Sequence, residues 1–263
     1  MIMDMFSHSR IGAYESCPRK FAFRYVEEVP ARGDSIEAFL GKRVHDALED
    51  LYQKAHTGLV LTEADLLQSF DDLWNVGWSA EVRVAAQGLT PEYYQSACRQ
   101  LLALYHRRHA PFTKNRLVAT EQRIEIPLDE AGQYRLQGFV DRIDEVAPGI
   151  IEIHDYKTNN RLPTQADRDA DRQLAIYELG ARELYPETKE VTLVWHYLRF
   201  DREIRSHRTV DQLNAVRREL LRKVNTIVEA MQKGHFPTRT SRLCDWCDYQ
   251  HCCPAMQRPP TEA

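Results

Sequence analysis

The first half of the chain repeats its apolar residues with the period of a helix. Val44, Leu48, Leu51 and Ala55 form one stripe with spacings of three and four residues, as in an amphipathic helix that buries one side. Similar stripes, preceded by residues typical of helix starts, recur up to residue 109. The pattern predicts helices over residues 9–17, 41–56, 62–78 and 91–109.

From about residue 117 the pattern changes to the alternation of β-strands. Residues 117–128 alternate in part, and two further runs follow, separated by a turn centred on Pro148 and Gly149. We therefore expect three consecutive antiparallel strands over residues 117–128, 133–141 and 150–157. The rest of the chain predicts a helix over 166–184, strands over 191–200 and 203–209, and a long helix over 210–233.

Helices before and after these strands favour an α/β fold with a mixed central sheet flanked by helices and a mainly helical N-terminal half. No repeat, low-complexity tract or linker rich in Pro, Gly and Ser divides the 263 residues, so we expect a single domain over residues 1–263. Within it we expect a helical insertion over about residues 46–115 and a flexible tail over residues 258–263.

Charge and hydropathy narrow the function classes. The net charge of −4 excludes a nucleic-acid binder that works by overall basicity, so any such contact must be local. Apolar runs are short and interrupted by charge, and the first residues lack the basic and then apolar pattern of a signal peptide. We expect a cytoplasmic protein with no membrane contact.

Charged side chains occur where the strand pattern predicts burial. In an extended strand Ile153, Asp155 and Lys157 share one face, and a turn at residues 147–149 would place Asp141 roughly opposite Asp155. Converging carboxylates repel one another unless a divalent cation binds between them, and Mg²⁺ takes one or two carboxylates plus substrate phosphate. The hairpin indicates a metal-dependent phosphodiesterase centre, with an edge hairpin of solvated charges as the alternative.

The cysteines form a second candidate site. The C-terminal order Cys-x2-Cys-x5-Cys, which begins at Cys244, has the spacing of metal ligands, and disulfides are unexpected in a cytosolic chain. Cys17 is the candidate fourth ligand, because it precedes a proline as some iron–sulfur ligands do. The alternative is a zinc knuckle completed by Cys252 or His251, whereas Cys98 fits a helix core.

Six segments carry a family resemblance, which spans nearly the whole chain. They are the N-terminal segment around Cys17, Gly41-Lys-Arg-Val-His45, Gly138-Phe-Val-Asp141, Asp155-Tyr-Lys157, Gln173-Leu-Ala-Ile-Tyr177, and the C-terminal Cys244, Cys247 and Cys253. In order and spacing they resemble the PD-(D/E)XK nuclease superfamily, and within it the RecB-like exonucleases with an iron–sulfur cluster, such as the CRISPR-adaptation nucleases and the AddB-type nuclease domain. Val140 departs from the family's nominal proline.

The resemblance implies a restriction-endonuclease-like core and a nuclease centre. His45, Asp141, Asp155 and the backbone carbonyl of Tyr156 would bind Mg²⁺ or Mn²⁺, and Lys157 would orient or deprotonate the attacking water or stabilise charge at phosphorus. A cluster, expected to be 4Fe-4S, would join the two ends of the chain. Its implied ligands are Cys17, Cys244, Cys247 and Cys253, and the residues implied in catalysis are Asp141, Asp155, Lys157, Gln173 and Tyr177.

Two further candidates have weaker support. Gln173 and Tyr177, four residues apart, share one helix face; they would support the metal and its water or touch the DNA backbone, or they are a polar pair on a core helix. Glu121, on the strand before the hairpin, would bind a second ion or orient the lysine. Its alternation with Arg123 and Glu125 fits a solvated role better.

The expected activity is hydrolysis of DNA phosphodiesters, most simply as an exonuclease on single strands or DNA ends, in repair, recombination or CRISPR-type processing with a helicase or other partner. The competing hypothesis is a non-catalytic DNA-end-binding or helicase-associated adaptor subunit, stapled by zinc or an iron–sulfur cluster.

Overall fold

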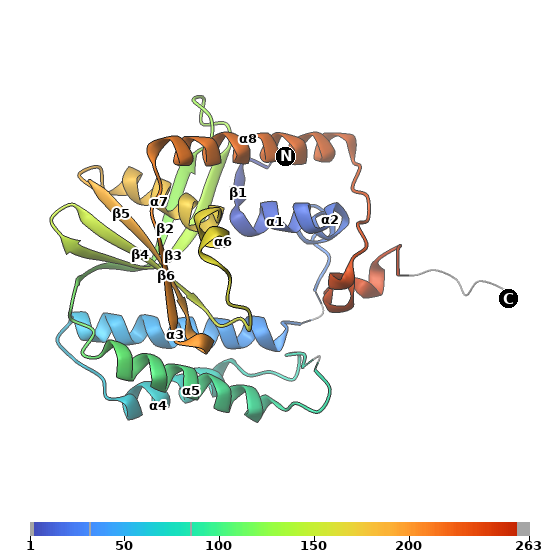
Figure 1. Ribbon diagram of the computed structural model, residues 1–263. Helices are drawn as coiled ribbons and strands as arrows, with labels where there is room; N and C mark the ends of the chain where they lie inside the picture. The colour runs from blue at the N-terminus through green and yellow to red at the C-terminus, as the bar shows by residue number, and fades with distance from the viewer. Residues whose placement is uncertain (1–2, 32, 85, 257–263) are drawn as a thin grey trace.

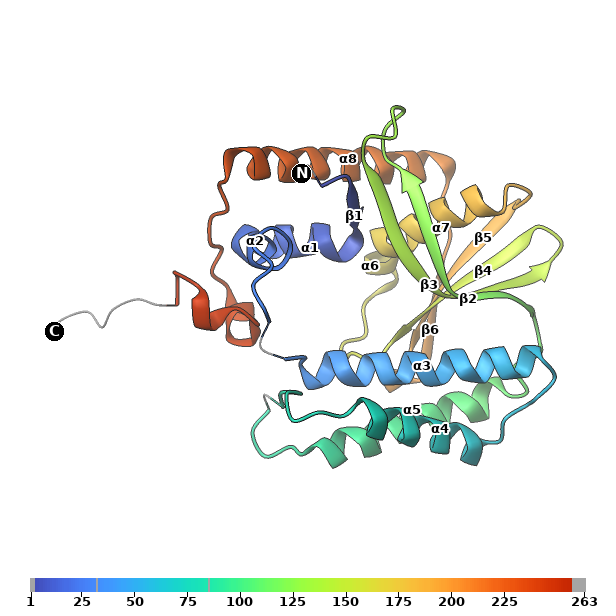
Figure 2. The same cartoon turned by 180° about the vertical axis from the view of Figure 1, so that it is seen from behind.

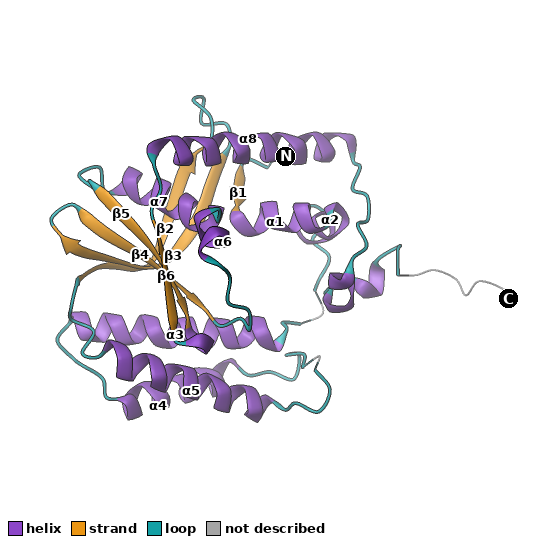
Figure 3. Ribbon diagram, viewed as in Figure 1, coloured by secondary structure: helices purple, strands orange, loops and turns teal. Residues whose placement is uncertain are grey.

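The alternating segments in the middle of the chain pair into one mixed sheet (Figure 3). The computed structural model describes residues 3–31, 33–84 and 86–256. Within these residues the strands are β1 (Met5–Ser7), β2 (Arg116–Pro127), β3 (Arg135–Ala147), β4 (Ile150–Lys157), β5 (Glu190–Tyr197) and β6 (Arg202–Ser206).

The sheet runs in the order β1-β3-β4-β5-β6, and β2 also pairs with β3. β2, β3 and β4 are consecutive antiparallel strands, as expected, whereas β4 and β5 are parallel and β6 returns antiparallel to β5. The short β1 pairs in parallel with the beginning of β3. The predicted α/β class with a mixed central sheet is confirmed.

Helices cover both faces of the sheet (Figure 1). On one face α7 and α8, together with α1, pack on Ile153 and Leu193 in one apolar cluster. On the other face α3, α4 and α5 form a second cluster that Tyr156 enters from the sheet. The helix bounds are α1 (His8–Ser16), α2 (Pro18–Tyr25), α3 (Ile36–His56), α4 (Glu63–Gly77), α5 (Pro91–His109), α6 (Gln165–Asp169), α7 (Arg172–Leu184) and α8 (Val210–Lys233).

Helix α3 follows the predicted stripe but begins earlier than predicted. The Ser35 side chain accepts the backbone N–H of Ala38 and so caps the helix start. Ile36, Phe39 and Leu40 extend the buried stripe before residue 41, so the predicted start at residue 41 is wrong by one and a half turns. The added turns matter because they fix the position of residue 45 over the sheet.

The predicted helix over residues 166–184 is wrong in one respect, because the structure has two helices there. Helix α6 ends at Asp169, and the Asp171 carboxylate then accepts the backbone N–H groups of Gln173 and Leu174 at the start of α7. This cap fixes the first turn of α7, from which Gln173 projects.

Two other parts of the prediction need correction or stay open. β1 and α2 were not predicted, and the strand expected over residues 191–200 ends at Tyr197 in the short 3₁₀ turn η1 (Leu198–Phe200). The expected tail over residues 258–263 lies outside the described residues. In the described part of the chain, every helix is too short or too polar to cross a membrane.

Candidate active site

Asp155 and Lys157 lie at the end of β4 and face α7. Asp155 is only 2% exposed, and its Oδ2 lies 2.7 Å from Lys157 Nζ. Burial and the nearby Asp141 raise the pKa of Asp155 to about 6, although Lys157 opposes the shift. Burial lowers the pKa of Lys157, but the carboxylates outweigh it and keep that pKa above its usual value. Lys157 is therefore a cation at neutral pH.

Asp141 lies on the neighbouring strand β3, opposite Asp155, as the sequence predicts. Arg142 pairs with His154 in the β3–β4 ladder, so Asp141 and Asp155 occupy the next position along it. Asp141 Oδ2 accepts the backbone N–H of Tyr156 at 2.8 Å. This bond holds the carboxylate beside β4 and leaves its other oxygen for a second partner.

His45, on α3, lies beside Asp141 and the backbone of Tyr156. Its Nε2 lies 2.8 Å from the backbone carbonyl oxygen of Tyr156 and its Nδ1 lies 3.4 Å from Asp141 Oδ2. Burial lowers the pKa of His45, but Asp141 and Asp155 outweigh it and raise that pKa to about 9. The imidazolium thus forms a positive link between two oxygen groups that could instead share a metal ion.

Glu121 completes this group. The pairs Thr120 with Arg142 and Gln122 with Val140 bracket it, so it lies opposite Asp141 in the β2–β3 ladder. Its φ of 44° is rare for a residue other than glycine, and backbone strain of this kind is concentrated at functional sites.

The side chain of Glu121 also points to the site. One ligand atom each from Glu121, His45 and Asp141 lies within 4.8 Å of the other two. Desolvation beside Asp141 raises the pKa of Glu121 to about 7. Because Glu121 is exposed, the solvated role and the role as a ligand both remain predictions.

Gln173 and Tyr177 hold Lys157 from α7. Lys157 Nζ donates to Gln173 Oε1 at 3.0 Å, and Gln173 Nε2 donates to the Tyr177 hydroxyl at 3.0 Å. A Cβ at Gly138 would lie 2.9 Å from Tyr177 Cε1, so the glycine leaves room for this ring. The spacing of four predicted the pair, but nothing in the sequence assigned Gly138 to it.

Two open cavities are lined by residues of this group. One, of about 310 Å³, is lined by His45 and Glu121 together with the acids Asp46 and Glu49, which the sequence analysis missed. Both acids follow His45 on α3, by one and by four residues. A spacing of four places two residues on the same side of a helix, so the sequence could have indicated that Glu49 lies beside His45. The other, also of about 310 Å³, is lined by Ser7, His8, Ser9, Gln137, Gly138, Phe139, Gln173, Ile176 and Tyr177.

Four cysteines from the two ends of the chain lie around a separate cavity. The C-terminal segment after α8 lies beside α2 (Figure 2), and there a cavity of about 180 Å³ is lined by Cys17, Cys244, Cys247 and Cys253. Backbone N–H groups of Arg239 and Ser241 each lie 3.4 Å from a cysteine sulfur. The alternatives Cys252 and His251 are not among the residues that line this cavity. Cys98 is buried in the helical layer, as predicted.

Comparisons with known proteins show the family and the fold. Residues 5–254 match the family model described as the PD-(D/E)XK nuclease superfamily. A solved structure from Eubacterium rectale, provisionally assigned as an exonuclease, has the same fold, with a TM-score of 0.53 and 13% identity over 97% of this chain and 90% of its own. A second, SSO0001, has a TM-score of 0.37 and 15% identity over 92% and 95% of the two chains. No curated protein matches significantly.

Proposed function

This chain belongs to the PD-(D/E)XK nuclease superfamily, and from that premise we propose that it is a Mg²⁺- or Mn²⁺-dependent DNA exonuclease of the RecB-like branch. The observation that carries the proposal is the convergence of Asp141, Asp155 and Lys157 from two neighbouring strands. His45 joins them, because its Nδ1 lies 3.4 Å from Asp141 Oδ2 and its Nε2 lies 2.8 Å from the Tyr156 carbonyl oxygen. The products would be 5′-phosphate and 3′-hydroxyl ends, as the family resemblance implies.

The donor set suits a divalent cation. His45, Asp141, Asp155 and the Tyr156 carbonyl would hold Mg²⁺ or Mn²⁺, and Glu121 is placed to bind a second ion or the water of the first. Oxygen donors dominate, which favours these hard cations over softer ones. When bound, the metal activates a water and neutralises charge on the scissile phosphate.

Lys157 acts as a charged donor in this proposal. Without a metal, Asp155 and Asp141 outweigh burial and raise its pKa, which favours the ammonium form. Asp155 and Gln173 fix the position of its ammonium group. As an ammonium group it would orient the attacking water or stabilise charge at phosphorus; a metal on the two carboxylates would lower its pKa and so keep proton transfer from water open.

A single strand or a frayed end fits the second cavity. Phe139 is 51% exposed beside Gln173 and Tyr177 and offers a ring face on which an unpaired base could stack. Bulk basicity is absent, so contact would depend on such local features and on the metal. A helicase or a recombination or CRISPR-type partner would supply the strand in the pathways that the resemblance suggests.

The four cysteines that line one cavity would bind an iron–sulfur cluster, expected to be 4Fe-4S. Four cysteines around one cavity support this assignment, and backbone N–H groups are directed at the sulfurs of Cys17 and Cys244, where hydrogen bonds to sulfur would tune a cluster. Broad visible absorbance and iron by elemental analysis of anaerobically purified protein would test it. Colourless, iron-free protein that holds zinc would contradict it.

Cleavage of end-labelled DNA tests the nuclease proposal. Wild-type protein should degrade linear single strands or DNA ends with Mg²⁺ or Mn²⁺ and leave circular DNA intact, and Asp155→Asn should not cleave. Asp72→Asn, which removes an exposed carboxylate on α4, serves as the matched control. A wild-type protein that binds DNA ends without cleaving them under any of these conditions would favour the adaptor function instead.

A further inference from the structure

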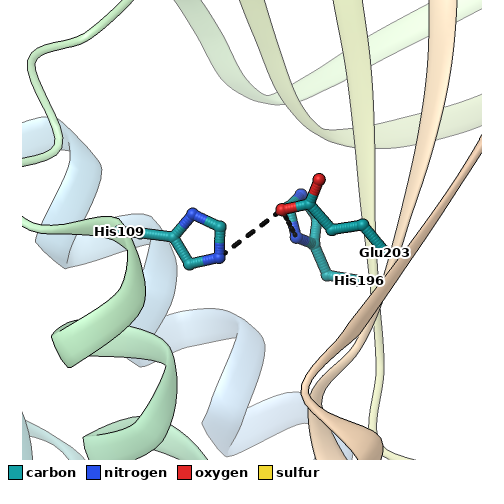
Figure 4. Close-up of side chains that lie close together, drawn as sticks. All are labelled: His109, His196 and Glu203. Atoms are coloured by element: carbon teal, nitrogen blue, oxygen red, sulfur yellow. Dashed lines mark ion pairs between the residues drawn. The ribbon is translucent and has the colours of Figure 1, made fainter.

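A second group of ligand-type side chains lies on the sheet face that packs against α5. His109 ends α5, His196 lies in β5 and Glu203 lies in β6 (Figure 4). One ligand atom from each lies within 4.8 Å of the other two. The β5–β6 register places His196 directly beside Glu203, so the sheet fixes two of the groups and the helix end brings the third.

The spacing of these groups is that of ligands around one ion. Glu203 Oε1 lies 3.6 Å from His109 Nε2 and 3.6 Å from His196 Nδ1, and both distances are too long for hydrogen bonds. Two ligands of a tetrahedral zinc ion, with bonds of about 2.0–2.1 Å, lie roughly 3.4 Å apart. The three groups are therefore placed to share a central partner rather than to bind one another.

A chain of buried groups orients the His196 ring. His196 Nε2 lies 2.9 Å from His154 Nδ1, and His154 Nε2 faces Asp144 Oδ2 at 3.3 Å. We assign the proton of His154 to Nε2, the atom that faces the carboxylate, and in this tautomer His154 Nδ1 accepts from His196 Nε2–H. The lone pair of His196 then lies on Nδ1, the atom that faces Glu203. Metal-binding histidines are commonly oriented through their second nitrogen in this way.

The space beside these groups is small. A cavity of about 10 Å³ lies among Tyr105, His109, His196 and Glu203, enough for one ion or one water but for no organic substrate. Arg108 lines it too, but its guanidinium pairs with Asp201 at 3.0 Å.

We propose that His109, His196 and Glu203 bind one divalent transition-metal ion of the zinc type. Two imidazoles and one carboxylate, with a fourth position open to water, suit zinc better than Mg²⁺. The ion would tie the end of α5 to β5 and β6. The His196 ring also lies 5.3 Å from the Tyr156 ring, so the ion would brace the catalytic strand from the face opposite Lys157. The site is separate from the proposed nuclease centre and does not depend on it.

The proposal is tested by measuring how much zinc each chain binds. The protein is dialysed to equilibrium against Zn²⁺, and its zinc content is then determined by elemental analysis. Because added Zn²⁺ can also occupy free cysteines or the nuclease centre, the informative value is the difference between variants. Glu203→Gln keeps the side-chain shape, and we expect it to bind one zinc fewer than the wild type. His109→Ala should lose the same equivalent, and in both variants the rise in melting temperature caused by zinc should shrink. His56→Ala, which removes an exposed histidine of α3, should match the wild type.

Two results would overturn the proposal. In one, folded Glu203→Gln and His109→Ala bind as much zinc as the wild type, as expected if the three groups surround a water. In the other, Asp141→Asn removes the same equivalent that Glu203→Gln removes, which would assign that zinc to the nuclease centre. Loss of the weak visible absorbance of bound Co²⁺ in Glu203→Gln, without loss of sulfur-to-cobalt bands, would support the assignment independently of stability.

Discussion

The two faces of β4 carry ionisable side chains in opposite ways. Asp155 and Lys157 face α7, and their neighbours Gln173 and Tyr177 line an open cavity. His154 and Tyr156 face the helical layer of α3 to α5, where the charged groups are buried against one another. One face thus leaves its charges available to a metal and a phosphate, whereas on the other Arg142 and Asp144 are buried beside each other.

We call the face of β4 toward α7 the open face and the face toward α3 to α5 the closed face. Arg142 shows how the closed face tolerates a buried charge. Its Nε lies 3.2 Å from Asp144, its Nη1 donates to the Tyr105 hydroxyl at 3.1 Å, and its guanidinium lies 3.7 Å from the centre of the Tyr52 ring. Burial raises the pKa of Asp144, and Arg142 opposes that rise. Partners of this kind make burial of a charge affordable. The comparison predicts that substitutions on the open face change activity and substitutions on the closed face change stability.

The largest effect is expected from Asp155→Asn. This substitution removes a proposed metal ligand and the partner of Lys157, so cleavage should fall by about a thousandfold or more. Single-turnover cleavage with Mg²⁺ measures the rate, and a far-ultraviolet circular dichroism spectrum checks the fold. A rate within tenfold of the wild type would remove Asp155 from the centre.

Substitution of Arg142 by Met tests the closed face. The change leaves Asp144 buried without its cation, and the free energy of unfolding should fall by about 3–5 kcal/mol. Urea unfolding measures this loss, while cleavage per folded molecule should change much less. The double variant with Asp144→Asn should recover part of the loss. If that variant is as unstable as the single one, the two charges do not act as a pair.

A smaller effect is expected from Gly138→Ala. The new methyl would lie 2.9 Å from Tyr177 Cε1, so the ring must move and Gln173 would hold Lys157 less well. We expect the cleavage rate to fall by about 10- to 100-fold, as for other residues that position a metal centre through a neighbour. Gly12→Ala is the control, because nothing lies within 4 Å of its added Cβ. Equal rates for the two variants would show that the close approach has no consequence.

The smallest effect is expected from Glu121→Gln, as a pH-dependent change in melting temperature. The pKa of Glu121 is about 7 in the folded protein and about 4.3 in an unfolded chain, so the folded state holds the proton more tightly. Its contribution to stability is fully present below about pH 4 and is lost as the pH rises through about 7. In a chelator, Glu121→Gln should therefore raise the melting temperature more at pH 8 than at pH 5. Equal shifts at the two pH values would mean that this carboxyl is not desolvated.

Local pattern predicted most elements because the apolar residues of each repeat with one period. Residues 210–233 and 91–109 were placed to the residue, since a polar cap precedes each stripe and the stripe ends where the helix does. The register of Asp141 with Asp155 followed from the turn alone. The family motifs then predicted that His45 and Gln173 belong to the same site, and that the cysteines form a second one.

Features that depend on distant contacts could not be read from the sequence. Helix α2 and strand β1 are short, and β1 exists because β3 offers it a partner. Glu121 alternates like a solvated residue, and only the unusual backbone at that point and the approach of α3 bring it to His45. His109 and His196 are 87 residues apart in number, and no local pattern links them. Tertiary packing decides such cases.

Binding of Mn²⁺ at the open face tests the central claim most directly. Titration of the protein with Mn²⁺, followed by electron paramagnetic resonance of the free ion, should show bound Mn²⁺ over the same concentration range in which cleavage of linear DNA appears. Asp141→Asn and Asp155→Asn should lose this binding and the cleavage together, while Arg142→Met should keep both. If the two aspartate variants bind Mn²⁺ as the wild type does, or if the wild type cleaves DNA in excess chelator, these carboxylates are not the metal centre of this protein.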